Sequence, residues 1–297
     1  MRADLTIVIP VYDRQDELCR CLDSILAQTL RPDRVIVVDD GSHDNSVDVA
    51  RQHPLAPLVI TADHGGAAAA RNIGLSEVTT GWTMFFDSDD IMSPEHLAKA
   101  MENIDDRTDI VGWNVSYRTL TGSRHILRFE TDDIRWHNIM HGTMSTQRYM
   151  ARTELFRKAG GWSPEVRYWD DIELGSRLLA LNPNVKKIEA VNVTVIQSAK
   201  SISGTVWSDN PKKYQSFFDA AKSKDNAIPS DWIALKKAIL AADIFRENPA
   251  EGRRMFDSIE LKTFPVRLAY YYRRTGMRGI ARFLRPFFSK SEGRGEK

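Results

Sequence analysis

Three aspartates stand close together at the end of one apolar run, "MFFDSDD" at 84–90. Carboxylates this close repel one another unless water or a cation screens them. Three kinds of site fit Asp87, Asp89 and Asp90: a solvated strand end that caps the next helix, a phosphatase-type nucleophilic aspartate, or oxygen ligands for a divalent cation that also binds phosphates. The phosphatase pattern Asp-x-Asp-x-Thr/Val is not met, because Ile91 occupies its last position and the run is the fourth apolar run of the chain.

Apolar runs and amphipathic stretches alternate over the first hundred residues. Helices are expected within 13–28, 46–53, 65–78 and 93–104, and buried strands within 5–12, 34–45, 56–61 and 81–90. The last helix should have Ser93 as its N-cap and Pro94 at its first position. This alternation predicts an α/β fold with a mostly parallel, Rossmann-like sheet and helices on both faces. Because ligands bind at the carboxyl edge of such sheets, the polar turns at 12–14, 39–42 and 87–90 should meet in one crevice.

The pattern changes after about residue 112. Further elements are expected as antiparallel strands in 109–120 and 124–129, a helix in 145–162 closed by Gly160–Gly161, a helix in 168–181 and a strand in 185–197. From about Pro211 onward, apolar positions recur at helical spacing. We therefore divide the chain into 1–112, 113–208 and a helical C-terminal region at 209–297, whose last polar residues, 289–297, are expected to be disordered.

Composition excludes some classes of protein. The 297 residues are 42% hydrophobic, and 41 basic against 40 acidic residues give a net charge of +1, which does not point to a nucleic-acid partner. The segment 262–290, however, holds eight basic residues, seven aromatic ones and no acidic one. Such a stretch can lie on an anionic membrane surface. The alternatives are a surface helix with solvated arginines, or a nucleic-acid arm that nothing else in the chain supports.

Cysteine usage and hydropathy indicate a location. Cys19 and Cys21 would face different sides of a helix, so a bridge between them is not expected, and they fit core or partly buried thiols of a reducing compartment. The chain opens with no signal-peptide pattern, and no run approaches the roughly 18 apolar residues that a membrane span requires. We expect a cytoplasmic protein, at most peripheral on the inner face of the cytoplasmic membrane.

Seven stretches together carry a family resemblance: "TIVIPVYDR", "CLDSILAQT", "VIVVDDGSHDNS", "GGAAAARNIGL", "FFDSDDIMSPEHL", "RTELFRKAGGW" and "WDDIELGSRL". In this order and spacing, from about residue 4 to 205, the chain resembles the family 2, GT-A-fold nucleotide-sugar glycosyltransferases. The resemblance implies that 1–112 binds the nucleotide sugar and that 113–208 binds the acceptor and supplies the catalytic base. It implies inverting transfer from a UDP-sugar, or another nucleoside diphosphate sugar, to a saccharide or lipid-linked saccharide, usually in surface polysaccharide or lipopolysaccharide assembly. The QxxRW motif of processive synthases is absent, which favours transfer of a single sugar.

The resemblance assigns the nucleotide pocket to specific residues. Pro10, Val11 and Tyr12 should line the pocket for the base, with Tyr12 near the base itself. Asp39 should accept the N–H of a pyrimidine as a charge-assisted hydrogen bond, and Arg71 should lie against the base or the phosphates. The alternatives are a core aromatic for Tyr12, a turn cap onto Gly41 and Ser42 for Asp39, and a helix-face ion pair for Arg71.

The same resemblance explains the acidic cluster. Asp87 and Ser88 belong on the ribose and sugar side of the donor, and Asp89 on a Mn²⁺ or Mg²⁺ ion that bridges the two phosphates. Asp90 is expected to support the site or to cap the next helix. A cation with its pyrophosphate would thus relieve the repulsion among the carboxylates.

The catalytic base is expected in "WDDIELGSRL", which matches the family's acidic pair, usually Glu-Asp, at the start of a helix. On that match Asp171 is the base and Asp170 replaces the Glu. The alternative is that both are only acidic residues of a first helical turn, where the helix dipole stabilises them. A helix start lowers the pKa of an acid, which suits a base only if the cleft is partly dry. The chain departs from the family at His64, where Asn is common, and at Gln197 and Ser198, where many relatives carry a His.

Two other functions remain open at this stage. A nucleotidylyltransferase uses a similar sheet, but it normally has a Gly-rich loop with Arg after the first strand, and "IPVYDR" contains no glycine. A non-catalytic sugar-nucleotide-binding protein derived from an enzyme would keep the pocket and lose the chemistry. Turnover by an Asp171→Asn variant would count against the assigned base.

Overall fold

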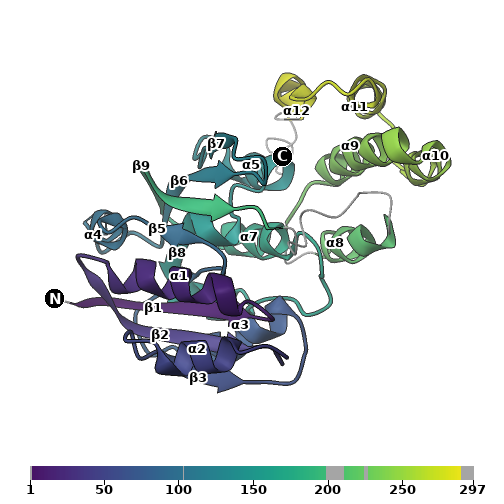
Figure 1. Cartoon of the computed structure of the whole chain (residues 1–297). Coiled ribbons are helices and arrows are strands. Elements are labelled where there is room, and N and C mark those ends of the chain that lie inside the picture. Colours follow the sequence, from purple (N-terminus) through teal and green to yellow (C-terminus); the bar gives the residue numbers. More distant parts are fainter. Residues whose placement is uncertain (1, 103, 199–210, 224–226, 289–297) are drawn as a thin grey trace.

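A nine-stranded sheet forms the centre of the protein in the computed structural model, which describes residues 2–102, 104–198, 211–223 and 227–288 (Figure 1). The spatial order of the strands is β3-β2-β1-β4-β8-β6-β9-β5, and β7 pairs with β6. The strands are β1 Arg2–Val11, β2 Arg31–Asp39, β3 Leu58–Thr61, β4 Trp82–Phe85, β5 Ile91–Met92, β6 Ile110–Arg118, β7 Arg124–Leu127, β8 Tyr149–Arg152 and β9 Val185–Ile196.

Helices cover both faces of this sheet and continue beyond it. They are α1 Gln15–Leu26, α2 Ser46–Gln52, α3 Ala67–Ser76, α4 His96–Met101, α5 Ile134–His141, α6 Thr153–Lys158, α7 Asp170–Ala180, α8 Gln215–Ala220, α9 Ser230–Glu247, α10 Pro249–Asp257, α11 Phe264–Arg274 and α12 Ile280–Leu284. Short 3-10 turns lie at Thr146–Arg148, Pro211–Tyr214 and Arg285–Phe287.

The second half of strand β1, from Ile7 to Val11, shows why its sequence is a continuous apolar run. Leu5, Ile7 and Ile9 point into a core shared with α1 and α4, whereas Val8 points into the opposite core, shared with α3, α6 and α7. Successive side chains of a strand alternate between faces, so a strand covered on both sides needs a continuous apolar run. The expectation of helices on both faces of the sheet is confirmed.

Parallel pairing occurs in two parts of the sheet, among β1–β4 and between β6 and β9. The strands β1–β4 pair in parallel, as the alternation of strands and helices predicts. The predicted antiparallel strands at 109–120 and 124–129 are β6 and β7. The four-residue strand β8 joins the two halves by antiparallel pairing with β4 and β6. It lies inside 145–162, where only a helix was expected. The strand was not predicted because four residues carry too little periodicity to be recognised.

The start of one predicted helix is wrong. The helix α4 begins at His96, two residues after Pro94, and Ser93 serves a different element. The backbone N–H of Ser93 donates to the carbonyl of Asn192 in β9 (2.7 Å), next to the pairing of β5 with β9. Pairing with a strand a hundred residues away therefore overrides the local helix-start signal. The predicted helix end at Gly160–Gly161 is confirmed, since both glycines have positive φ directly after α6.

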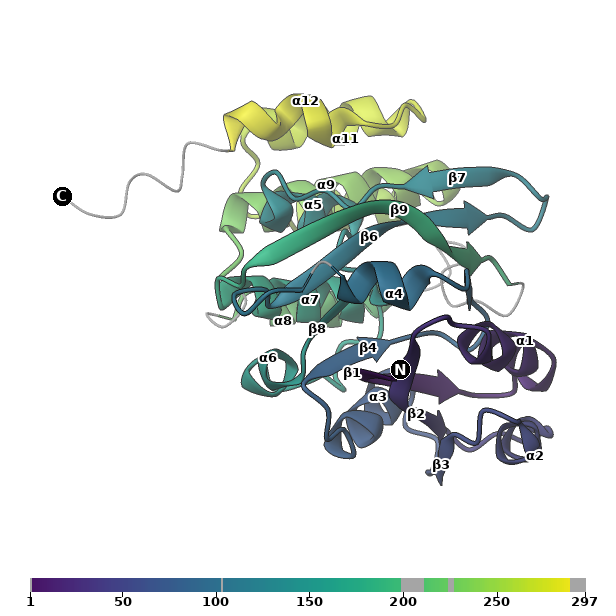
Figure 2. The same cartoon turned by 90° about the vertical axis from the view of Figure 1, so that its left-hand side faces the viewer.

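The C-terminal helices have their own apolar core, which includes Trp136 of α5, Phe217 of α8, Trp232 of α9 and Val266 of α11. Figures 1 and 2 both show α9–α12 on the side of the molecule away from β1–β3. The predicted helical C-terminal region is thus present; its boundary at 208/209 and the tail 289–297 lie outside the described residues. Among the described helices, none combines the length and apolarity that crossing a bilayer demands.

Close packing of α3 on the sheet gives a first prediction. A Cβ on Gly74 would lie 2.3 Å from Cγ1 of Val8 and 3.2 Å from Cγ2 of Val38. Although alanine favours helix, overpacking of a core costs about 1–3 kcal/mol, so Gly74→Ala should lower the free energy of unfolding and the Tm. Ser76→Ala, on the exposed side of the same helix, should change stability by less than about 0.5 kcal/mol. A Tm for Gly74→Ala equal to that of the native chain would contradict this packing.

Candidate active site

The three polar turns meet in one cleft of about 1030 Å³. It lies at the carboxyl ends of β1, β2 and β4, beside the starts of α3 and α7. Eight of the nine residues proposed from the sequence line it: Pro10, Val11, Tyr12, Arg71, Asp87, Ser88, Asp89 and Asp171. The ninth, Asp39, is buried and is not part of the lining.

Asp39 keeps one carboxylate oxygen unused. Its Oδ2 accepts the backbone N–H of Ser42 (3.2 Å), as the turn-cap alternative expects. Its Oδ1 is buried and has no hydrogen-bond partner among the described residues. A buried acceptor without a donor is costly, so this oxygen is suited to receive an N–H from a ligand.

Asp40 fixes the loop that precedes α3. Its carboxylate accepts the backbone N–H groups of Gly65 (2.8 Å) and Gly66 (2.9 Å), and it pairs with Nδ1 of His64 (2.9 Å). Gly66 has φ +91°, a backbone conformation that residues other than glycine rarely adopt. The loop places the ring of His64 4.4 Å from the ring of Tyr12, so the departure from the usual Asn adds a second ring to this end of the cleft.

Arg71 links the acidic turn to the start of α7. Its guanidinium donates to Asp87 (2.8 Å) and to Asp170 (3.2 Å), and it lies 4.4 Å from the centre of the Trp162 ring. Burial lowers the pKa of Arg71, but the carboxylates of Asp87 and Asp170 outweigh it and raise the pKa above its usual value. The ion-pair alternative therefore describes Arg71 in this structure, with both partner carboxylates in the cleft.

Asp87 and Asp89 face different partners. One carboxylate oxygen of Asp87 is held by Arg71, and the other accepts a hydrogen bond from the amide of Gln147. Asp89 lies 3.7 Å from the guanidinium of Arg14. Burial, followed by the charge of Asp87, raises the pKa of Asp89 to about 6 although Arg14 opposes the shift. Asp89 thus carries the less neutralised carboxylate of the two.

Asp90 has a structural contact of its own. Its Oδ1 accepts the backbone N–H of Ile196 at the end of β9 (2.8 Å), and burial raises its pKa well above the usual range. This contact ties the acidic turn to the second half of the sheet. It agrees with a supporting role for Asp90.

The residues around Asp89 fit a divalent cation. Carboxylate oxygens are the ligands that Mg²⁺ and Mn²⁺ prefer, and the carboxylates of this turn have too few cations beside them. The side chains at the usual His position are engaged elsewhere: Gln197 accepts the N–H of Leu120 (3.2 Å), and Ser198 accepts a hydrogen bond from Arg14 (2.7 Å). Asp89 is then the main protein ligand that this turn can offer.

Asp171 lies in the first turn of α7, where its Oδ1 accepts the backbone N–H of Ile172 (2.8 Å). Burial, followed by the charge of Asp170, raises the pKa of Asp171 to about 7. Desolvation in the cleft therefore outweighs the helix start, which answers the question that the sequence left open. An acid with this pKa can accept a proton near neutral pH.

Aromatic side chains line the cleft next to Asp171. The ring of Tyr214 lies 5.4 Å from that of Tyr168 and 4.6 Å from that of Trp169. Tyr214 follows the second half of the sheet in the chain and belongs to the C-terminal region. That region therefore contributes directly to the cleft.

Several of these side chains were not predicted from the sequence, among them Arg14, Gln147 and Tyr214. Arg14 lies three residues after the end of β1, so its place at the sheet edge could have been inferred from the turn at 12–14. Gln147 sits in a 3-10 turn within a stretch expected to be helical, and Tyr214 lies in the C-terminal region outside every quoted motif. No sequence signal identifies these two.

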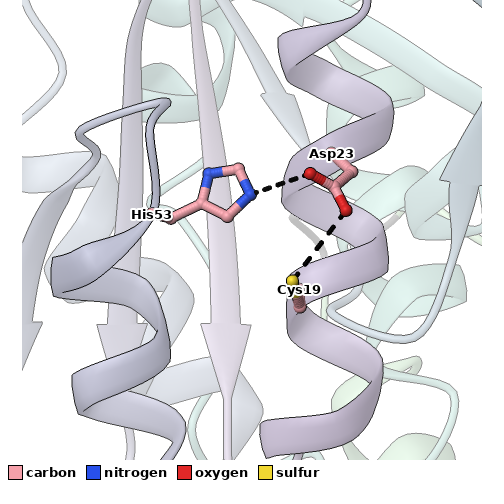
Figure 3. Close-up of side chains that lie close together, drawn as sticks. All are labelled: Cys19, Asp23 and His53. Atoms are coloured by element: carbon pink, nitrogen blue, oxygen red, sulfur yellow. Dashed lines mark hydrogen bonds and ion pairs between the residues drawn. The ribbon is translucent and has the colours of Figure 1, made fainter.

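A second group of potential metal ligands, Cys19, Asp23 and His53, lies outside the cleft between α1 and the end of α2 (Figure 3). The backbone N–H of Leu55 donates to Nδ1 of His53 (3.1 Å), so the proton of the neutral ring must reside on Nε2. That nitrogen lies 3.2 Å from Asp23 and donates to it. The group is therefore a hydrogen-bonded link between two helices, and its imidazole has no lone pair directed at a metal.

Comparison with known proteins agrees with this geometry. The chain is 37% identical over 109 residues to the succinoglycan biosynthesis protein ExoW of Rhizobium meliloti, a match that covers 34% of each protein. The present chain spans less than two thirds of the length of the curated relatives that it matches. Two solved structures share its fold. TarS from S. aureus with UDP-GlcNAc has a TM-score of 0.61 at 16% identity, over 88% of this chain and 78% of that chain.

The second structure is the mannosyltransferase PcManGT from Pyrobaculum calidifontis with GDP-Man and Mn²⁺. Its TM-score is 0.56 at 17% identity, over 97% of this chain and 80% of that chain. The two likenesses confirm the GT-A-type α/β fold. A sequence model of the family "Glycosyl transferase family 2" matches residues 6–159, which is more than half of the chain. The chain therefore belongs to glycosyl transferase family 2.

Proposed function

We propose that this protein is an inverting, metal-dependent glycosyltransferase that moves one sugar from a nucleoside diphosphate sugar, with UDP favoured, to a saccharide or lipid-linked saccharide. One observation carries the proposal. A single cleft collects the acidic turn at 87–90, the ring of Tyr12 and the carboxylate of Asp171. Donor binding, leaving-group stabilisation and base catalysis can all take place there.

The donor nucleotide would bind where β1 and β2 end. Tyr12 and His64 form a pair of rings for the base, and Pro10 and Val11 line the same cleft. The unpaired Oδ1 of Asp39 is an acceptor for a pyrimidine N–H. Residues 1–112 are then the donor half, and 113–208 carry the base. Arg71 already neutralises two carboxylates, so in this proposal it acts on the donor through Asp87.

Asp89 would hold Mn²⁺ or Mg²⁺ together with the two phosphates of the donor, and Asp87 and Ser88 would face the ribose and sugar. When bound, the ion supplies Lewis-acid stabilisation of the leaving nucleoside diphosphate. Asp171 removes the proton from the acceptor hydroxyl as that oxygen attacks the anomeric carbon in an oxocarbenium-like transition state. A pKa of about 7 suits this step.

The acceptor would lie on the aromatic side chains beside Asp171. Tyr168, Trp169 and Tyr214 present rings that can contact the C–H faces of a sugar, while the hydroxyl reaches the carboxylate. The relative ExoW is named for succinoglycan biosynthesis. A role in surface polysaccharide or lipopolysaccharide assembly fits such an acceptor.

The donor and the base can be tested in one experiment. Thermal unfolding is measured with UDP, GDP, UDP-hexoses and GDP-mannose, with and without Mn²⁺, and the most stabilising sugar nucleotide is then used in a turnover assay. We expect a rise in Tm that requires Mn²⁺. Asp171→Asn should keep that rise but lose turnover by about a hundredfold or more, because it lacks the base.

The ionisation of Asp171 should make turnover depend on pH. Asp171 is an active base only when ionised, and its pKa is raised to about 7, so turnover should increase as the pH rises through about 7. The surface variant Asp48→Asn in α2 is the matched control and should leave both Tm shift and turnover unchanged. No Tm response to any nucleotide, or undiminished turnover by Asp171→Asn, would contradict the proposal.

A membrane contact would involve α11 and α12, which carry most of the basic, aromatic segment 262–290. Part of that segment is used internally: Tyr270 and Phe288 are buried, and Arg273 pairs with Asp243. Four large side chains remain mostly exposed, namely Phe264, Tyr271, Phe283 and Phe287. Exposed basic side chains stand on the same helices, namely Arg267 and Arg282. We propose that this face lies on an anionic membrane, where a lipid-linked acceptor would be found.

This surface predicts selective lipid binding. The triple variant Phe264→Ser, Phe283→Ser, Phe287→Ser should bind vesicles of phosphatidylglycerol and phosphatidylcholine at least about tenfold more weakly than the native chain in co-sedimentation. Ile126→Ser removes an equally exposed apolar side chain from β7 and should have no effect. The proposal fails if the native chain ignores anionic vesicles, or if the triple variant binds as well as the control.

A further inference from the structure

A lysine is buried in the C-terminal region beside the cleft. Lys236 of α9 is 8% exposed, and its ammonium lies 4.4 Å from the centre of the Trp169 ring and 3.4 Å from the carbonyl of Met140. Among the described residues, no carboxylate oxygen lies within 4.0 Å of its Nζ. Burying a charge costs several kcal/mol unless other charges or dipoles compensate it. A ring face and a carbonyl dipole contact the ammonium directly, and any carboxylate that balances its charge acts from a longer distance.

Two carboxylates are near enough to act on Lys236. Burial lowers the pKa of Lys236 to about 8, and Asp171 and then Asp243 oppose that shift. Asp243 is already neutralised, because the guanidinium of Arg273 donates to both of its oxygens (2.7 and 3.0 Å). Asp171 is thus the carboxylate whose charge Lys236 can balance.

The ring beneath the ammonium also sets the start of α7. Trp169 is the N-cap of α7 and has φ +59°, which is an unfavourable conformation for a bulky side chain. Its carbonyl accepts the N–H of Glu173 (2.9 Å), and its ring packs against Tyr214 and, edge-on at 5.2 Å, against Phe217. The helices α8 and α9 therefore hold the residue that lies two positions before Asp171.

We propose that Lys236 is a positioning residue for Asp171: from the C-terminal region, its ammonium holds Trp169 and favours the ionised form of the base. This inference rests on the proposed role of Asp171. Other residues, on α7 itself and on other elements, also act on Asp171 and must be held constant in any test. They are Asp170 in α7, Arg71 in α3, Asp87 after β4, Arg148 before β8 and Tyr149 in β8.

The direction of the effect follows from the charge. Lys236 stays largely protonated at neutral pH, and a cation near a carboxylate lowers the pKa of that carboxylate. Removing the ammonium should raise the pKa of Asp171 above its present value of about 7. A smaller fraction of the protein would then hold an ionised base at neutral pH.

The test measures the titration of Asp171 directly and needs no substrate. Side-chain carboxyl ¹³C shifts are followed by NMR against pH in the native chain and in Lys236→Met, with the Asp171 signal identified by its absence in Asp171→Asn. We expect the Asp170–Asp171 pair to titrate at a pH higher by about half a unit or more in Lys236→Met. Lys236→Arg, which keeps the charge, should titrate like the native chain.

The adjacent residue provides the matched control. Lys237 lies on the same helix with its ammonium 5.7 Å from the Phe218 ring, and Lys237→Met should leave the titration unchanged. An unchanged titration in folded Lys236→Met would overturn the inference, as would an equal shift in Lys237→Met. If Lys236→Met does not fold, Lys236→Gln replaces it under the same criteria. Loss of the proposed base role would appear separately, as turnover by Asp171→Asn.

Discussion

The site depends on one guanidinium that joins segments from two halves of the chain. Arg71 comes from α3, Asp87 follows β4, and Asp170 begins α7, 99 residues further along the sequence. The guanidinium also lies over the ring of Trp162, 4.4 Å from its centre, which gives Arg71 a third contact. Because both partners are carboxylates in the cleft, this interaction holds the acidic turn after β4 close to the start of α7. Without it, like charges would push the two elements apart.

Beyond this clamp, the cleft holds more negative charge than its cations can balance. The pKa values of Asp89 and Asp171 are raised to about 6 and about 7, in each case mainly by burial. A fold gains nothing in stability from such groups, since their ionised forms are disfavoured in the native state. Groups with pKa values perturbed in this way are common at functional sites, where a bound ligand supplies the missing opposite charge. A cation at Asp89 and a proton at Asp171 would each relieve part of it.

Much of the fold could be predicted because its signals are local. A strand covered on both faces carries a continuous apolar run, as β1 does from Ile7 to Val11, so β1 is recognisable from its sequence alone. The polar turns follow from the carboxyl-edge rule. Contacts between residues far apart in the sequence could not be predicted. Nothing in the sequence pairs Asp40 with Gly65 and Gly66, or Arg71 with Asp170. Lys236 in an amphipathic helix is expected to be solvated. Its burial comes from tertiary packing, which places its ammonium against the ring of Trp169 and the carbonyl of Met140.

Diffraction at the manganese absorption edge, from crystals grown with UDP and Mn²⁺, tests the central claim most directly. The account predicts an anomalous peak next to the carboxylate of Asp89, with uracil between Tyr12 and Asp39 and the phosphates directed toward Asp171. An anomalous peak between Cys19, Asp23 and His53, together with a cleft that contains neither metal nor nucleotide, would contradict it.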